Sequence, residues 1–445
     1  MDGHSSKQAI RISSETHKID PDLISNSAWK VLKGLIKAGY SGYLVGGAVR
    51  DLLLGRHPKD FDIATDATPE QVRKVFRNSR LIGRRFKIVH VRYGREIIEV
   101  ATFRASHENA EHSKDAQSDG GRLVRDNVYG TLDSDVWRRD FTANALYYDG
   151  SDQSVVDYVG GLQDVQNKQL RIIGDPETRF QEDPVRMLRA IRFAGKLDFK
   201  MDSEFEPILH SQSALLKEGS PARLFDEMLK LFHGGSALKT FELLRHYDVF
   251  RYFFPGAEQQ FQREQDGGFL ALVHAALKST DKRIGQDKPV TPAFLVAIML
   301  WNDVRYFARQ GISKKVPPMH SWLNASQRVV SNQSRHLTIP RRFSLAAKEI
   351  WLLQNKFSSR HGKKALRVLT HARFRAAYDF LCLRHESGEG DLKEAVTFWT
   401  DIQELPESEQ LKLLHVKDRR EADRPQEKRS RPRRRRRNKS RNRSG

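Results

Sequence analysis

The stretch YLVGGAVRDLLLGRHPKDFDIATD, residues 43–66, decides the fold of this chain. Its apolar beginning, Tyr43 to Val45, ends in Gly46-Gly47, and paired glycines let a backbone turn tightly and approach a ligand closely. The next residues have helical spacing, and Gly55 is a stop signal for that helix. A helix that begins just after a glycine turn presents free N–H groups and a positive dipole end. The pattern therefore predicts a phosphate-binding turn between a strand and a helix.

Two acids follow on one predicted strand. Asp60 and Asp62 alternate with Phe61 and Ile63, so both carboxylates should lie on one face while the apolar side chains face the core. Two carboxylates on a rigid edge repel each other unless a cation joins them, and Mg²⁺ favours such a site when substrate phosphates complete it. Arg50, one helical turn after the glycines, is placed to add a charge-assisted bond. These residues predict metal-assisted phosphoryl or nucleotidyl transfer.

Separately, a Gly-Gly pair is usually only a turn, and Asp-x-Asp is usually a solvated strand face. In this order and spacing they resemble the head-domain signature of the polymerase-β-like nucleotidyltransferases, in the branch of bacterial poly(A) polymerases and CCA-adding enzymes. The resemblance implies Asp60 and Asp62 as ligands of catalytic Mg²⁺. It implies Gly46, Gly47 and Arg50 as contacts of the nucleotide. It also implies an α+β fold, in which a head with a mixed sheet precedes an all-α neck and body.

A second motif is WRRDFTANAL, residues 137–146. Alone, its two arginines and aspartate are consistent with a surface ion-pair cluster. Beside the first stretch it matches the RRDFT-x-NA box of the same family, which implies Asp140 as a third active-site acid and Arg139 as a nucleotide-binding group. Glu99, an acid inside an apolar strand, competes for the role of third carboxylate, although its ordinary interpretation is an outward-facing edge residue. We favour Asp140.

A third motif is EDPVRMLRAIRF, residues 182–193, in which Asp183-Pro184 is a good helix start. Its ordinary interpretation is a capped helix with a solvated basic stripe. In the family, this motif implies that Asp183 and Arg186 read the edge of the base and that Arg189 helps to hold the nucleotide. An Asp acceptor and an Arg fork can match donors and acceptors on a base. A capping role for Asp183 would compete with base reading.

Composition and helix signals divide the chain into five segments. We predict a polar arm (1–25), a nucleotidyltransferase head (26–173), a helical neck (174–235), a helical RNA-binding body (236–405) and a disordered basic tail (406–445). Within the head, residues 88–93 and 97–103 should pair as a hairpin. The polar residues 105–123 predict a loop.

Basic charge is concentrated near the end of the sequence. The net charge is +21, and residues 417–445 contain 15 Lys or Arg against four Asp or Glu, a net +11. A flexible polyanion is the expected partner, with an anionic membrane surface as the rival. A run of five arginines predicts salt-sensitive RNA binding through counterion release. The residues of this run are Arg433, Arg434, Arg435, Arg436 and Arg437.

The single cysteine, Cys382, excludes an intrachain disulfide and a cysteine-based zinc site. The sequence shows neither a signal-peptide pattern nor an 18-residue apolar run, so we expect a cytoplasmic protein.

Three features favour poly(A) synthesis over CCA addition. The segment LIGRRFKIVHV (81–91) and the block PRRF…EIWLLQNKF…HARFRAAYDFL (340–381) both resemble regions of bacterial poly(A) polymerases, and the block alternates bases with aromatics as a single-stranded RNA track does. Amphipathic helices with basic outer faces are the ordinary interpretation of that block. The arginine-rich tail suits a sequence-indifferent RNA end.

We therefore predict a template-independent polynucleotide adenylyltransferase that adds AMP from ATP to RNA 3′ ends, with Mg²⁺ as cofactor. Its expected partners are ATP, single-stranded RNA 3′ ends and RNA-decay or RNA-chaperone proteins. A CCA-adding tRNA nucleotidyltransferase is the alternative, and a non-catalytic RNA-binding protein is the alternative from another class.

Overall fold

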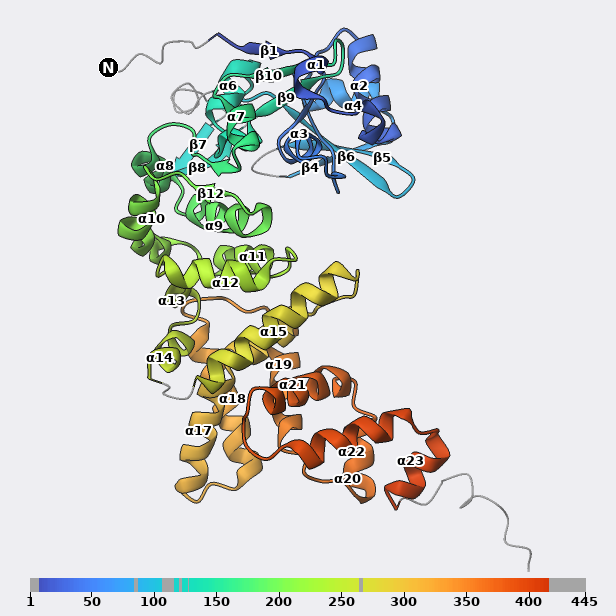
Figure 1. Ribbon diagram of the computed structural model, residues 1–445, viewed down its shortest axis with the longest axis vertical. Helices are drawn as coiled ribbons and strands as arrows, with labels where there is room; N and C mark the ends of the chain where they lie inside the picture. Colours follow the sequence, from blue (N-terminus) through green and yellow to red (C-terminus); the bar gives the residue numbers. More distant parts are fainter. Residues whose placement is uncertain are drawn as a thin grey trace, which may run out of the picture. The chain divides into compact units, whose positions relative to one another are not determined.

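The computed structural model describes residues 8–83, 87–105, 116–119, 122–126, 128–263 and 267–415. They form two compact units that divide between residues 348 and 349. Figure 1 shows a mixed sheet in the N-terminal part of the chain, and the later residues are almost entirely helical. The α+β fold class predicted from the sequence is confirmed.

The head is built on an eight-stranded sheet with the order β1-β10-β9-β2-β3-β6-β5-β4. At its centre, β2 (Tyr43–Val45) pairs antiparallel with β3 (Asp62–Thr65), and β3 pairs in parallel with β6 (Glu96–Thr102). The remaining strands are β1 (Ile10–Ile12), β4 (Ser79–Ile82), β5 (Ile88–Tyr93), β9 (Leu146–Asp149) and β10 (Val155–Asp157). Because β3 is central, residues at its start are held by neighbours on both sides.

Local sequence signals account for several elements of the head. The predicted hairpin is confirmed as β5 and β6, which are antiparallel. Helix α2 (Asn26–Lys37) packs on β3 and β6, and α4 (Pro69–Val75) packs on β4, β5 and β6. Helix α4 begins with a capping box in which Thr68 and Gln71 satisfy each other's backbone N–H groups. Helices α2 and α4 thus pack against the sheet of the head.

Two segments differ from the prediction. The predicted polar arm instead supplies the edge strand β1, which pairs with β10, followed by α1 (Ser14–His17) and η1 (Pro21–Leu23). Arg11 fixes this edge through ion pairs with Asp149 and Asp152. A three-residue strand is too short to show a period in the sequence, so the arm was misjudged.

The predicted loop 105–123 contains strand residues. Strands β7 (Ala116–Asp119) and β8 (Arg122–Asp126) pair antiparallel. Gly120-Gly121 separates them in the sequence, and a two-residue Gly-Gly connection is a recognised hairpin signal that the prediction did not use.

Helices continue the first unit after the sheet (Figure 1). Helix α9 (Val185–Leu197) packs on α8 (Pro176–Glu182), α11 (Pro221–Phe232) and α12 (Ala237–His246). The neck is not all-α, because β12 (Lys200–Met201) pairs in parallel with β11 (Gln169–Leu170). The other helical elements of this unit are α3 (Gly47–Leu53), α6 (Leu132–Trp137), η2 (Thr142–Asn144), α7 (Gly161–Gln166), α10 (Glu206–Gln212), η3 (Ser213–Glu218), α13 (Phe250–Phe253), α14 (Pro255–Arg263), α15 (Gly268–Gly285), α16 (Pro292–Met299), α17 (Trp301–Ser313) and α18 (Pro318–Gln333).

The second unit is helical. Helix α19 (Arg341–Gln354) runs across the division, and α20 (Gly362–Leu369), α21 (Phe374–Glu386), α22 (Lys393–Glu404) and α23 (Glu407–Leu413) follow. Trp399 is fully buried against the rings of Phe357 and Phe374. Cys382 is half-buried on α21. The predicted tail begins later than residue 406, because α23 is helical and Leu414 after it is completely buried.

Residues 416–445 lie outside the described residues, and the predicted RNA-binding arginines 433–437 lie among them. In the described part of the chain, no helix is both long and apolar enough to cross a membrane.

Candidate active site

The glycine turn joins β2 to α3, as the sequence predicts. Gly46 has φ +69° and ψ −126°, a conformation that residues with a Cβ rarely adopt, and α3 begins at Gly47. The Gly46 N–H donates to the carbonyl of Leu146 at 3.4 Å. A Cβ on Gly46 would lie 3.6 Å from Nη1 of Arg139, in van der Waals contact with that guanidinium. The turn and the second motif are therefore adjacent.

Arg50 connects three of the predicted motifs. Its side chain is buried, with 4% of its surface exposed, and Nη1 donates to Oδ1 of Asn144 at 2.6 Å. Its Nε and Nη2 donate to Asp51, and the guanidinium lies 5.6 Å from the ring centroid of Phe193 on α9. Arg50 thus links the glycine-turn helix to the second motif and to the neck helix. In this structure, all three guanidinium nitrogens of Arg50 donate hydrogen bonds to side chains of the protein.

Asp60 and Asp62 are both exposed, whereas Phe61 and Ile63 are buried, so the predicted alternation in burial is confirmed. The predicted strand is shorter than expected, because β3 begins at Asp62 and Asp60 lies in the bend before it. Asp62 begins β3, opposite Val45 of β2, the residue just before the glycine turn. Partial desolvation by the surrounding strands, and then the charges of Glu99 and Asp60, raise the pKa of Asp62 to about 6, while Arg139 opposes this shift. The Asp62 side chain is thus exposed, with the like charges of Glu99 and Asp60 and the opposite charge of Arg139 acting on it.

The third acid beside these two is Glu99. It lies directly opposite Asp62 in the parallel β3–β6 pair, and its side chain is 49% exposed. Nε2 of His90 on β5 is 3.1 Å from Oε1 of Glu99. The outward-facing interpretation of Glu99 and its interpretation as a neighbour of Asp62 therefore both agree with the geometry.

The structure shows Asp140 in the contact between the second motif and α9. Asp140 is buried, its Oδ1 accepts the Phe141 N–H, and Nη2 of Arg189 approaches its Oδ2 to 2.6 Å as an ion pair without an aligned hydrogen bond. Over the residues that the structure describes, no group of three or more His, Cys, Asp or Glu side chains is arranged to hold a metal ion.

Arg139 is the basic group of the second motif that faces the site. Its Nη2 donates to Oδ2 of Asp135 at 2.9 Å and its Nε to the Tyr147 hydroxyl at 2.6 Å. Burial opposes the charged form of Arg139, but the hydrogen bonds to the Tyr147 hydroxyl and to the Asp135 carboxylate outweigh it and raise the pKa of Arg139. The guanidinium is therefore a fixed positive charge between the glycine turn and Asp62. Its neighbour Arg138 differs, because burial and the charges of nearby arginines lower its pKa to about 10.

The base-reading residues of the third motif are already engaged. Asp183 follows α8; its Oδ1 accepts the Val185 N–H at 3.3 Å, and its Oδ2 pairs with Nη2 of Arg223 at 2.9 Å. Arg186 is buried, and its Nη1 donates to the Arg179 carbonyl and to Glu182 at 2.7 Å each. Asp183 is therefore not the N-cap of α9, which is Pro184, but one carboxylate oxygen accepts the first N–H of that helix and the other carries an ion pair to α11.

Two residues that the sequence did not assign to the site also belong to this region. Asn144 anchors Arg50, and its place in the NA pair of the second motif was the available signal. Arg192 follows Arg189 in the basic row of α9. Burial and the neighbouring charge of Arg189 lower its pKa, and its Nε is buried without a hydrogen-bond partner among the described residues. A cation in this setting is suited to an anionic ligand.

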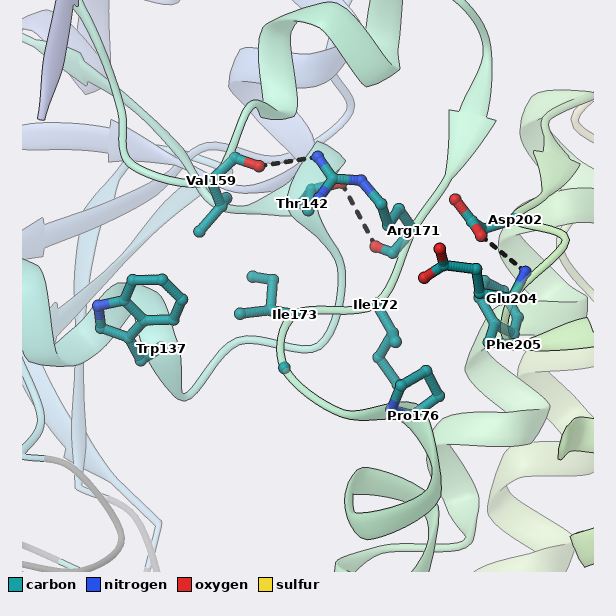
Figure 2. A pocket seen from close by; sticks show the side chains of 11 residues that line it. Trp137, Thr142, Val159, Arg171, Ile172, Ile173, Pro176, Asp202, Glu204 and Phe205 are labelled. Atoms are coloured by element: carbon teal, nitrogen blue, oxygen red, sulfur yellow. Dashed lines mark hydrogen bonds between the residues drawn. The ribbon is translucent and has the colours of Figure 1, made fainter. Parts of the chain in front are cut away.

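A separate cavity of about 230 Å³ is lined partly by the second motif and partly by residues of the neck (Figure 2). Trp137, Ile173 and Phe205 supply apolar walls. Arg171 donates to the Val159 carbonyl across the cavity wall, as Figure 2 shows. Neither the strand carboxylates nor Arg50 line this cavity, so it is distinct from the candidate active site.

The chain matches known protein families over most of its length. Residues 42–171 match the family model "Poly A polymerase head domain", and residues 198–261 and 314–440 match "Probable RNA and SrmB- binding site of polymerase A" and "Polymerase A arginine-rich C-terminus". Poly(A) polymerase I of Salmonella typhimurium is 44% identical over 94% of this chain and 92% of its own length. The Haemophilus influenzae protein of the same name is 42% identical over 93% of both chains.

The chain belongs to the bacterial poly(A) polymerase family. It is a template-independent polynucleotide adenylyltransferase, an enzyme that extends RNA 3′ ends with AMP. The CCA-adding enzyme of Lactobacillus helveticus is 40% identical over only 51% of this chain and 55% of its own length. The nucleotidyltransferase family generally uses a divalent metal ion, and Asp60 and Asp62 are carboxylates of the kind that hold one.

Solved structures agree on the fold. A "tRNA-processing enzyme (apo form I)" matches with a TM-score of 0.61 at 23% identity, over 91% of this chain and 95% of its own. A tRNA nucleotidyltransferase complexed with a primer tRNA and an incoming ATP analog matches with a TM-score of 0.56 at 22% identity, over 84% and 99% of the two chains.

Proposed function

We propose that this polynucleotide adenylyltransferase joins the α-phosphate of ATP to the 3′-hydroxyl of single-stranded RNA at the surface between β3 and the glycine turn. The observation that carries the proposal is the placement of two exposed carboxylates, Asp60 in the bend before β3 and Asp62 at the start of β3, beside the glycine turn and near Arg139. Negative charge for a metal and positive charge for a triphosphate are thereby adjacent.

The carboxylates fit a divalent cation. Like charge from Glu99 and Asp60 raises the pKa of Asp62, so a cation that neutralises the group would be favoured there. We propose Mg²⁺ held by Asp60 and Asp62, because it prefers a site of one or two carboxylates that substrate phosphates complete. When bound, the metal would lower the pKa of the RNA 3′-hydroxyl and stabilise the pyrophosphate leaving group.

The triphosphate would be held by the glycine turn and the arginines around it. The N–H groups at Gly46 and Gly47 begin α3, and Arg139 is a fixed cation beside them. Arg50 would act from its anchored position on Asn144, and Arg189 would reach the nucleotide from α9. Asp140 would act as an active-site acid that positions Arg189. Glu99 would be the third carboxylate near the metal.

The adenine would be read by Asp183 and Arg186 in the neck. The ion pair of Asp183 with Arg223 and the bonds of Arg186 to Glu182 support this role, because they hold both side chains in fixed orientations before the base arrives. A rigid donor and acceptor pair rejects a base whose edge does not match, since buried polar groups would then be unpaired.

The RNA would lie along the helices after the head, with the arginine-rich tail adding sequence-independent affinity. The matched description that names RNA and SrmB supports both an RNA and an RNA-decay or RNA-chaperone protein as partners of residues 198–261. The proposed location is the cytoplasm, where ATP and RNA ends are both present.

Primer extension with purified protein tests the proposal. An oligo(A) primer is incubated with Mg²⁺ and each nucleoside triphosphate separately, and long products are expected with ATP alone. Asp60→Asn and Asp62→Asn should each lower the rate by at least about a hundredfold. Asp401→Asn, at an exposed position on α22, is the matched control and should leave the rate unchanged. Incorporation of CTP that stops after CCA on tRNA would overturn the assignment.

A further inference from the structure

A second cavity, of about 630 Å³, opens in the first unit away from the candidate active site. Its walls come from η3, the start of α11, α13, α14 and the residues after α18. Helix α9 of the site packs on α12, α12 contacts α13, and α13 contacts α14. With neighbouring helices typically 8–10 Å apart, the cavity lies on the order of 20 Å from α9. An RNA strand leaving the active site along the neck could reach it.

The charge of the cavity is positive and incompletely neutralised. Lys217 and Arg335 are exposed at its rim, and neither pairs with a carboxylate within the described ranges. Glu258 also lines the cavity, but Arg245 neutralises it through two bonds of 3.0 Å. Arg251 is balanced by Asp248 at 2.8 Å. Two cations therefore remain for an anionic ligand, which is the number that the two phosphates flanking one nucleotide require.

An aromatic ring forms part of the wall. Tyr252 is nearly buried, and its hydroxyl is held by Arg251 at 3.1 Å and by Ser213 at 3.3 Å, so the ring orientation is fixed. Lys217 lies 5.5 Å from its centroid. Cations next to a fixed aromatic ring are a common arrangement for single-stranded nucleic acid, in which phosphates meet the cations and a base packs on the ring.

Two amides complete the cavity. Gln259 and Gln262 are three residues apart on α14, so they lie on the same face, and both are exposed. Neither side chain has a hydrogen-bond partner among the residues whose placement is described. A glutamine amide offers one donor and one acceptor side by side, which matches N6 and N7 on the N7 edge of adenine. On the corresponding edge of cytosine a C5–H lies beside the amino group, so this pair of bonds cannot form there.

We propose that this cavity holds one adenosine of the growing RNA tail, upstream of the 3′ end, with its phosphates on Lys217 and Arg335 and its base between Tyr252 and the amides of Gln259 and Gln262. The inference rests on the proposed function, because the strand that occupies the cavity is the product of that reaction. Binding here favours RNA that already carries adenosines, so extension becomes easier once a tail has begun.

The first test measures binding of fluorescent 15-nucleotide oligo(A) and oligo(C) to the full chain over a range of salt concentrations. Lys217→Ala with Arg335→Ala should weaken both oligomers and lower the slope of log Kd against log salt by about 1.4, since each lost phosphate contact contributes about 0.7. Gln259→Leu with Gln262→Leu should weaken oligo(A) about fivefold and oligo(C) by less than about twofold.

Matched controls are Lys282→Ala on α15 and Gln286→Leu just after it, both at exposed positions outside the cavity, and thermal unfolding verifies that every variant is folded. Cavity variants that bind both oligomers as the controls do would overturn the proposal. Equal weakening of oligo(A) and oligo(C) by the glutamine changes would overturn its adenosine selectivity.

Photocrosslinking separates a tail nucleotide from a free one. Oligo(A) with 8-azidoadenosine at successive upstream positions should label the peptide of residues 250–263 from one position only. Labelling by free 8-azido-AMP without labelling by any oligomer would assign the cavity to a free nucleotide instead and overturn the proposal.

Catalysis distinguishes this inference from the proposed function. Cavity variants should keep the kcat of the first AMP addition at saturating primer. Asp62→Asn should lose kcat but keep the Kd for oligo(A). If Asp62→Asn remained active, the proposed function would fail, while the oligomer measurements would still decide the role of the cavity.

Discussion

Asp62 of β3 and Glu99 of β6 lie directly opposite each other in a parallel strand pair, and no positive side chain of these two strands separates them. Desolvation and the Glu99 charge are the two largest causes that raise the pKa of Asp62 to about 6. Asp140, the acid that the sequence favoured for this place, is paired with Arg189 instead. The two acids should therefore affect catalysis in different ways.

The first prediction compares Glu99→Gln with Asp140→Asn in primer extension. Glu99→Gln removes negative charge beside Asp62, so we expect a higher Mg²⁺ concentration at half-maximal rate. Asp140→Asn frees Arg189, so we expect a raised KM for ATP with an unchanged Mg²⁺ requirement. Mg²⁺ and ATP titrations of both variants give the answer. A shifted Mg²⁺ requirement in Asp140→Asn alone would restore Asp140 as the third metal-side carboxylate.

The second prediction concerns pH and stability without metal. A carboxyl group whose pKa rises from 3.8 to about 6 on folding stabilises the fold below pH 4, and this contribution is lost as pH rises through 6. Above that pH the charged Asp62 is unfavourable. Asp62→Asn should thus raise the free energy of unfolding at pH 8, but not at pH 4. We expect an effect on the order of 1 kcal/mol, because solvent screens this exposed group.

Urea unfolding in EDTA at both pH values measures this effect, with Asp401→Asn as the control. Mg²⁺ should then stabilise the wild-type chain and not Asp62→Asn, because only the former gains a bound cation. A gain in stability that is the same at pH 4 and pH 8 would show that charge is not its cause.

Local sequence patterns predicted the parts of the site whose geometry depends on residues that are adjacent in the sequence. The alternation of Asp60 and Asp62 with Phe61 and Ile63 follows from strand geometry, and the glycine turn before α3 follows from backbone freedom at Gly46. The family motifs added Arg139 and the start of α9.

Partners that are distant in sequence were not predictable in the same way. Asp62 and Glu99 meet only because β3 and β6 pair in parallel, and a register between distant strands leaves no mark in either strand alone. The pairing of Asp140 with Arg189 likewise depends on how α9 packs against the second motif. Strand β1 was not predicted, because three residues are too few to show an alternation of polar and apolar side chains.

The third prediction separates the base-reading role of Asp183 from its hydrogen bond to the start of α9. Asn can accept the Val185 N–H as Asp does, so Asp183→Asn should change the free energy of unfolding by only a few tenths of a kcal/mol, whereas Asp183→Ala loses this bond and should cost about 1 kcal/mol. Both should reduce the preference for ATP over CTP, because both remove the carboxylate that we propose reads the base, together with its ion pair to Arg223. Single-nucleotide extension with each triphosphate measures this preference. If Asp183→Asn kept full ATP preference, the carboxylate charge would have no part in base selection.

The fourth prediction concerns the acceptor of Arg50. Asn144→Ala leaves Nη1 of a buried guanidinium without its bond of 2.6 Å, and hydrogen bonds to charged groups contribute about 1.5–3 kcal/mol. The variant should lose stability by about 2 kcal/mol and raise the KM for ATP more than it lowers kcat. Asn167→Ala, which removes an exposed acceptor of Gln163, is the control and should leave the KM unchanged. An unchanged KM in Asn144→Ala would exclude Arg50 from triphosphate binding.

The last prediction uses two glycines that both have positive φ but differ in their surroundings. Gly46 and Gly39 both have positive φ, +69° and +85°, so an alanine is strained at either position by about 1–3 kcal/mol. A Cβ at Gly39 meets nothing within 4 Å, whereas at Gly46 it faces Nη1 of Arg139 at 3.6 Å. Gly39→Ala should therefore lower stability alone, and Gly46→Ala should also raise the KM for ATP, because the methyl group occupies the space between the turn and the arginine. Thermal unfolding and steady-state kinetics on both variants separate these effects. Equal KM values would mean that the triphosphate does not approach this turn.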